Sequence, residues 1–170
     1  MAIKAWIGKR IALIGAFVLL ICLGYLSSQM APDTSKRNWP MQFTSAGQRL
    51  YFTGQGTSGQ RMLPSGGNHH MTMMGSGACV DCHGTNREGG RLWPTFWSKA
   101  PAITFSALSG AHGEDGHDHE TYSAETLAKA IADGVRPDGT SIGPGMPRWS
   151  MPSQSLDDLV NYLLSPPNDK

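Results

Sequence analysis

Two cysteines and a histidine in one short run are the residues of this chain best suited to chemistry. The run is Cys79-Val80-Asp81-Cys82-His83. Two thiols separated by two residues, with an imidazole directly after the second, form the spacing by which a c-type haem is attached to a polypeptide. Each thiol bonds one vinyl group of the porphyrin, and the imidazole binds the iron as proximal ligand. The run therefore predicts one covalently attached haem c, held by Cys79, Cys82 and His83.

Two other uses of this spacing are a thioredoxin-like redox pair and one half of a zinc site. A structural zinc site needs two further Cys or His residues at a second short spacing. The only other cysteine, Cys22, lies in an apolar segment. Neither alternative finds support in the sequence, so haem attachment is the favoured interpretation.

A methionine in a segment rich in glycine and proline is the candidate for the second axial ligand. In Gly143-Pro144-Gly145-Met146-Pro147-Arg148-Trp149, extended backbone can press against a flat cofactor while a rigid proline directs the side chain. A thioether ligand is typical of electron transfer, whereas an open position suits gas or peroxide chemistry. We predict that Met146 is the distal ligand, with Met151 as the first alternative, ahead of Met71, Met73 and Met74.

The elements that position these residues are expected to be mostly helical. Predicted helices begin at Thr44 or Ser45, at Ser123, and near Ser153 or Ser155, and the last two end at about Asp133 and before Pro166. The last helix carries apolar residues at i, i+3, i+4 and i+7, namely Leu156, Leu159, Val160 and Leu163. Strand-like alternation is nearly absent, and residues 54–77 are expected to form a loop around the haem pocket.

The first thirty residues differ from the rest of the chain. Lys4, Lys9 and Arg10 precede residues 11–26, which carry no charge. With its flanks this run approaches the ~20 residues that a helix needs to cross a membrane. Because no small-x-small cleavage site follows, we expect residues 1–30 to be a retained anchor rather than a cleaved signal. The basic end stays in the cytoplasm and the haem domain is exported, with residues 31–43 as a linker.

Charge and cysteine content exclude some classes of protein. Without the three basic residues of the anchor, eleven Lys and Arg remain against thirteen Asp and Glu, a formal charge of about −2, so nucleic acid is not an expected partner. Because haem attachment uses Cys79 and Cys82, no disulfide framework is expected despite export.

A dense histidine cluster lies between two predicted elements, at residues 111–120. His112, His117 and His119 could bind copper or zinc, and His69-His70 beside the methionine cluster could add ligands. Glycines and alternating charge favour the simpler interpretation, a solvated surface loop.

With these motifs in view, the chain resembles the class I c-type cytochromes over roughly residues 44 to 165. The matching features are Gly47 with Tyr51 and Phe52, Cys79 to His83, Gly134 to Gly139, Met146-Pro147-Arg148-Trp149, and Leu159 to Leu163. The resemblance implies three to five helices around one haem c, with His83 and Met146 as the axial pair. It also implies that the first and last helices cross at Gly47, Tyr51 and Tyr162. The expected cytochrome c domain spans residues 44–166, with inserts at 54–77 and 110–121.

The resemblance leaves open which residues surround the haem ligands. The proximal imidazole usually donates its other N–H to a backbone carbonyl, often a proline carbonyl in this family, and Pro94 and Pro101 are the candidates. Arg91, Arg136 or Arg148 is a candidate partner for a haem propionate.

These features favour a membrane-tethered monohaem cytochrome that passes single electrons between respiratory-chain partners, for example to a terminal oxidase, as a carrier or as a subunit of a larger complex. The sequence contains no nucleophile or acid–base constellation, so we expect no enzymatic activity of its own and no small-molecule substrate. The expected location is a bacterial inner membrane, crossed once, with the haem domain in the periplasm. The alternatives are a haem oxidoreductase with a displaceable sixth ligand and a copper-handling haem protein rich in His and Met.

Overall fold

The computed structural model describes residues 18, 20–21, 39–67, 77–92, 97–110 and 121–166. The chain divides into two compact units, Met1–Thr34 and Ser35–Lys170. In the first unit only Val18, Leu20 and Ile21 are described, and these helical residues are exposed. None of the described helices is both long enough and apolar enough to cross a membrane. The rest of the predicted anchor at residues 1–30 lies outside the described residues.

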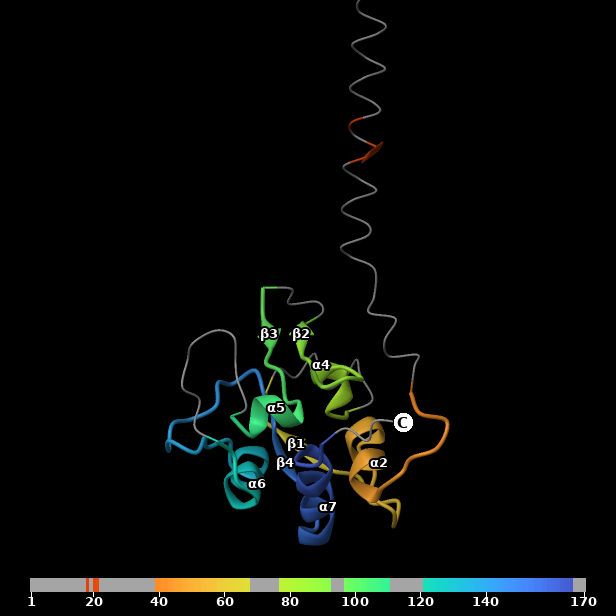
Figure 1. The fold of residues 1–170 in the computed structure, drawn as a ribbon, viewed down its shortest axis with the longest axis vertical. Coiled ribbons are helices and arrows are strands. Elements are labelled where there is room, and N and C mark those ends of the chain that lie inside the picture. Colours follow the sequence, from red (N-terminus) through yellow and green to blue (C-terminus); the bar gives the residue numbers. More distant parts are fainter. Residues whose placement is uncertain are drawn as a thin grey trace, which may run out of the picture. The chain divides into compact units, whose positions relative to one another are not determined.

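The second unit contains helices of different length and two short sheets (Figure 1). In chain order the elements are α2 (Ala46–Thr53), β1 (Leu63–Ser65), α4 (Val80–His83), β2 (Gly90–Arg91), β3 (Lys99–Ala100), α5 (Phe105–Leu108), α6 (Ala124–Ala132), β4 (Arg148–Ser150) and α7 (Ser153–Leu163). Helices α2, α6 and α7 lie where the sequence predicts them. The single-turn helix α5 and the strands were not predicted.

Side-chain caps explain where the longer helices begin. The Ser45 hydroxyl accepts a hydrogen bond from the Gln48 amide at 3.0 Å, and so satisfies one N–H that the first turn of α2 leaves without a partner. Ser123 and Thr126 form a reciprocal capping box at the start of α6. Both caps are at the serines that the sequence marked as helix starts.

Helices α2 and α7 cross in close contact. A Cβ atom added to Gly47 would overlap the carbonyl oxygen of Asp158 and lie 2.7 Å from the Cβ of Tyr162. The rings of Tyr51 and Tyr162 are also neighbours, with centroids 5.6 Å apart. The predicted crossing at Gly47, Tyr51 and Tyr162 is therefore confirmed.

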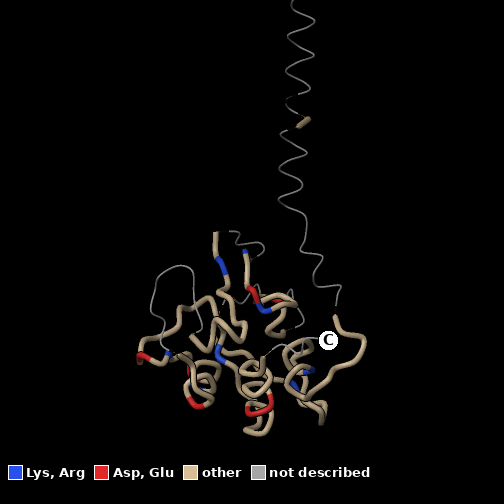
Figure 2. Tube along the Cα trace, viewed as in Figure 1, with Lys and Arg blue, Asp and Glu red and all other residues tan. Residues whose placement is uncertain are grey.

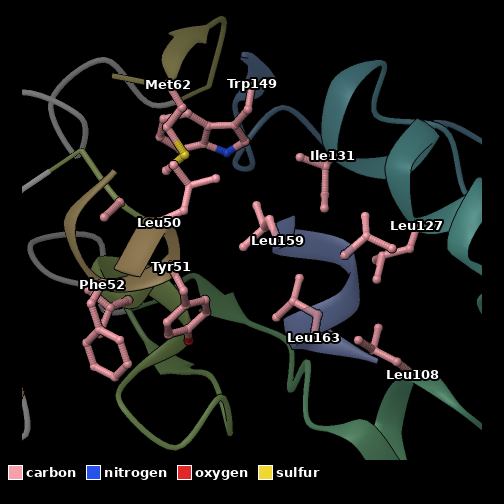
Figure 3. Packing of buried hydrophobic residues seen from close by; sticks show 13 residues of the cluster. Leu50, Tyr51, Phe52, Met62, Leu108, Leu127, Ile131, Trp149, Leu159 and Leu163 are labelled. Carbon is pink, nitrogen blue, oxygen red and sulfur yellow. The ribbon is translucent and has the colours of Figure 1, made fainter. Parts of the chain in front are cut away.

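The hydrophobic core lies between these two helices and α6 (Figure 3). Figure 3 shows Leu159 of α7 between Leu50 of α2 and the side chains of Leu127 and Ile131 from α6, and Leu50 beside Met62 and Trp149. Further core residues are Tyr51, Phe52, Met62, Leu108 and Trp149. The apolar stripe predicted for the last helix thus faces the core, with Leu159, Val160 and Leu163 buried and Leu156 partly buried at its edge.

Residues 39–43, which the sequence analysis assigned to the linker, pack on the domain. The ring of Trp39 meets that of Phe52 edge-on with centroids 5.9 Å apart, and the ring of Phe43 lies 6.0 Å from the same Phe52. The sequence shows no periodicity here because two isolated aromatic residues, rather than a regular element, make the contact.

Residues 54–67, the described part of the segment predicted to be a loop, contain strand β1. It pairs antiparallel with β4, in the register Leu63 to Ser150 and Ser65 to Arg148. The second sheet joins β2 to β3. Strands of two or three residues are too short for the alternation by which strands are recognised in a sequence, so the sequence does not predict them.

Charged residues of both signs are spread over the second unit (Figure 2). The strands β2 and β3 carry the exposed basic residues Arg91 and Lys99, whereas the exposed Glu125 and Asp157 lie on α6 and α7.

Candidate haem site

The two cysteines and the histidine of the predicted attachment motif lie on one helical turn. Cys79 is the N-cap of α4 and already has helical φ and ψ angles of −61° and −36°. The amides of Cys82 and His83 both donate to the Cys79 carbonyl, at 3.2 and 2.9 Å. Because residues three apart on a helix are neighbours on its surface, the turn brings the two thiols to one side. The next residue along is His83.

The imidazole of His83 is buried and held in one orientation. Only 7% of the residue is exposed, and Nδ1 lies 3.0 Å from the carbonyl oxygen of Pro101. Burial lowers the pKa of His83, although the Pro101 hydrogen bond opposes this. A neutral ring that donates from Nδ1 uses Nε2 as its metal-binding nitrogen. Pro101 is therefore the acceptor, and Pro94 lies outside the described residues.

A glycine turn holds the segment that carries the Pro101 carbonyl. The Gly89 amide donates to the His83 carbonyl at 2.9 Å, and a Cβ atom on Gly89 would lie 2.6 Å from the Pro101 oxygen. The φ angle of Gly89, +72°, is also one that other residues rarely adopt. The close approach of the two segments thus requires glycine at this position.

The environment of the thiols does not suit a thioredoxin-like pair. Burial, followed by the neighbouring Cys82 thiol, raises the pKa of Cys79 to about 12. Reactive redox cysteines need the opposite, a lowered pKa that populates the thiolate. Within the part of the chain that the structure describes, no three His, Cys, Asp or Glu residues are grouped so that they could hold a metal ion. The histidines at 69, 70, 112, 117 and 119 lie outside that part.

Met146 lies in the connection between α6 and β4 and is partly buried. Its amide donates to the Gly143 carbonyl at 3.3 Å, and the following Pro147 is buried. Gly67 packs on this proline, since a Cβ atom on Gly67 would be 2.9 Å from the Pro147 Cα. The alternative ligand Met151 packs against the hydrophobic core. Met71, Met73 and Met74 lie outside the described residues, and ligation by Met146 stays a prediction.

Two of the three arginines considered for a haem propionate, Arg136 and Arg148, donate hydrogen bonds to other residues of the loop that carries Met146. The Arg148 guanidinium donates to the carbonyls of Met146 and Ile142, at 2.7 and 2.8 Å. Arg136 donates to the carbonyl of Ser141 at 2.6 Å and to the hydroxyl of Thr140 at 3.2 Å. These contacts direct both groups to the loop that carries Met146, and the arginine partner of a propionate stays a prediction.

Two buried residues, Tyr51 and Arg87, tie the segment around the attachment turn to other helices, a role that the sequence did not indicate. The hydroxyl of the buried Tyr51 donates to the Gly84 carbonyl at 2.6 Å, which links α2 to the residue after His83. Arg87 is buried as well, and its guanidinium donates to the carbonyls of Tyr162 and Leu163 at the end of α7. An arginine in a turn-rich segment gives no signal of such a role, because its acceptors lie 75 and 76 residues further along the chain.

These residues fit a haem c group. The chain supplies two thiols on one turn, a neutral imidazole oriented by a backbone carbonyl, and a proline-flanked thioether on a separate loop. When bound, the haem supplies a reversible one-electron iron couple. The contribution of the protein is to hold and orient the ligands.

Comparison with known proteins supports this assignment. The family model described as cytochrome c matches residues 45–166, which is more than two thirds of the chain. The comparisons with curated proteins and with solved structures gave no significant match. The chain therefore belongs to the cytochrome c family, whose members carry covalently bound haem c and transfer electrons.

Proposed function

We propose that this protein is a membrane-tethered monohaem electron carrier that transfers single electrons between partners of a respiratory chain and catalyses no reaction of its own. The haem is held by Cys79 and Cys82, with His83 and Met146 as axial ligands. The main observation in favour is the buried His83 ring, whose Nδ1 is fixed by the Pro101 carbonyl at 3.0 Å. Such a bond orients the ring and makes it a stronger ligand.

Electron transfer is favoured by a rigid ligand set, because the protein then does not rearrange when the iron changes its oxidation state. On the proximal side, the Gly89 amide binds the His83 carbonyl and the Pro101 carbonyl binds the His83 ring. On the distal side, the backbone of Met146 is held by Arg148 and by packing around Pro147. Both arrangements support a six-coordinate iron, which binds no substrate.

The visible spectrum of the purified protein, with and without carbon monoxide, tests this ligation. We expect the oxidised protein to show the charge-transfer band between methionine sulfur and ferric iron, and the reduced protein to bind no carbon monoxide. The variant Met146→Ala should lose the band and bind carbon monoxide, because it lacks the sixth ligand. Met151→Ala is the matched control and should retain the band.

Two results would contradict this assignment. Ready binding of carbon monoxide by the wild-type protein would instead favour a haem oxidoreductase with a displaceable sixth ligand. If the band persists in Met146→Ala and disappears in Met151→Ala, the axial ligand is Met151.

The tether rests on the uncharged run at residues 11–26, which follows three basic residues. We expect the full chain, expressed with haem-attachment machinery in a bacterium, to sediment with the inner membrane and to need detergent for release. Mass spectrometry of the released protein should find residues 1–30 still present. Release by salt alone, or a mass that lacks these residues, would exclude a retained anchor.

The respiratory role follows from the proposed exposure of the haem domain to the periplasm. Donor and acceptor are then redox proteins or subunits of a respiratory complex in that compartment. Proteins that co-purify with this chain from gently solubilised membranes are the candidate donor and acceptor. The donor is the one whose substrate reduces the haem in the isolated complex.

A further inference from the structure

The loop between Gly134 and Arg148 is closed at two places by different arginines. Its first half is a hairpin, in which Val135 bridges to Ser141 and the Ile142 amide donates to the Gly134 carbonyl at 2.7 Å. The exposed Arg136 guanidinium donates hydrogen bonds across this hairpin, to the Thr140 hydroxyl and the Ser141 carbonyl. The second half, residues 143–147, carries Met146 and is not part of the hairpin.

Arg148 connects the second half to the first. One nitrogen of its guanidinium donates to the Met146 carbonyl at 2.7 Å and the other to the Ile142 carbonyl at 2.8 Å. The group lies directly on Gly134, where any Cβ atom would overlap it. Gly134 is buried and has a φ angle of +69°, so both its space and its conformation favour glycine. The absence of a side chain at residue 134 is therefore what makes room for the guanidinium.

We infer that Arg148 is a positioning residue, which keeps Met146 in place as the sixth ligand by fixing the backbone of residues 142–146. This inference rests on the ligation proposed above. The planar fork of an arginine reaches two separated carbonyls from two different nitrogens, whereas a lysine would have to serve both from one nitrogen at the end of a flexible chain. Without the guanidinium, the hairpin at 135–142 keeps its own hydrogen bonds. The segment that bears Met146 loses the two hydrogen bonds by which Arg148 joins it to the hairpin.

The affinity of the oxidised protein for added imidazole measures this effect. Imidazole binds the iron only when Met146 has left, so its apparent affinity is the intrinsic affinity multiplied by the fraction of molecules with the loop open. Losing two hydrogen bonds from a charged donor should raise that fraction, and with it the apparent affinity, by about ten- to a hundredfold in Arg148→Gln. Met146→Ala gives the upper limit, because its sixth position needs no opening.

Arg136→Gln is the matched control, since it removes a guanidinium from the same loop without touching residues 142–146. Its imidazole affinity should stay within about twofold of the wild type, because the Arg136 hydrogen bonds are exposed and both of their acceptors lie within the hairpin. Arg148→Lys keeps the charge but not the fork, and its imidazole affinity should lie between those of the wild type and Arg148→Gln.

Gly134→Ala keeps Arg148, but its methyl group occupies the space of the guanidinium, so the imidazole affinity should rise in this variant as well. In Arg148→Gln, hydrogen exchange should accelerate at the Met146 amide, which donates to the Gly143 carbonyl, and stay unchanged at residues 135–142.

The outcomes separate this inference from the proposed function. If the wild type shows no methionine band and binds imidazole as tightly as Met146→Ala, the proposed ligation is wrong. If the wild type shows the band but Arg148→Gln and Arg136→Gln bind imidazole equally, the ligation stands and the role of Arg148 is overturned. Should Arg148→Gln fail to fold, Arg148→Lys and Gly134→Ala decide the question by the same measurement.

Discussion

Replacing Gly47 by alanine should destabilise the folded protein by about 2–3 kcal/mol, because the added methyl group has no space where α2 crosses α7. The Cβ atom would overlap the Asp158 carbonyl oxygen, and backbone cannot move aside as a flexible side chain can. The helices would have to separate, and the contact of Tyr51 with Tyr162 would open with them. The measurement is equilibrium unfolding of the haem-loaded protein in denaturant, followed by circular dichroism.

The tight crossing and the helix propensity of alanine predict opposite changes in stability for Gly47→Ala, so the sign of the change distinguishes them. In an isolated helix the same change should stabilise by about 1 kcal/mol, because alanine is the better helix former. The control is Gly143→Ala, where no atom lies within 4 Å of the added Cβ and no positive φ is recorded. We expect that variant to stay within about 0.5 kcal/mol of the wild type. A Gly47→Ala protein as stable as the wild type would mean that the helices do not cross this closely in solution.

Replacing Arg87 by alanine should cost about 3 kcal/mol of stability, the combined loss of hydrogen bonds from a charged donor and of a cation–π contact. Its guanidinium donates to the carbonyls of Tyr162 and Leu163, at 3.2 and 3.3 Å. These are among the last carbonyls of α7, which have no partner within the helix. The guanidinium carbon also lies 5.0 Å from the centre of the Tyr162 ring. Unfolding in denaturant measures the loss.

A second variant separates the side chain from the backbone. Arg87 has a φ angle of +65°, which costs any residue with a Cβ atom roughly 1 kcal/mol. Arg87→Gly should therefore be about 1 kcal/mol more stable than Arg87→Ala, although both lack the guanidinium. Lys129→Ala, which removes an exposed cation from the last turn of α6, is the control and should change stability by less than about 1 kcal/mol. Equal stability of Arg87→Ala and the wild type would contradict the capping role.

The parts of the fold that were predicted are those governed by local rules. Ser45 and Ser123 cap helices because a hydroxyl reaches an amide three residues ahead, a relation visible in any sequence. The stripe that ends at Leu163 is likewise a property of one helix. Covalent attachment of haem follows from five consecutive residues and is supported by the family match.

The parts that the sequence left open or did not show depend on how the folded chain returns on itself. Whether Pro94 or Pro101 orients His83 depends on how the chain returns to the ring, and no spacing rule gives that path. Arg148 differs, because the carbonyls that it binds lie only two and six residues away, whereas the sequence named it only as a candidate for a propionate. Arginine has the same chemistry in both uses, and only the space above Gly134 distinguishes them.

The pairing of β1 with β4 bears on how this chain tolerates so long a connection before its haem motif. The entropy lost on closing a flexible loop grows only with the logarithm of its length, so doubling the length costs about 0.6 kcal/mol. One net backbone hydrogen bond, worth about 1 kcal/mol, offsets such a doubling. By adding Leu63–Ser65 to the strand that follows Met146, the longer connection recovers its own entropic cost and adds contacts beside the ligand loop. Extra chain at this place is thus close to neutral in free energy, which makes it a part of the fold where length can change without loss of stability.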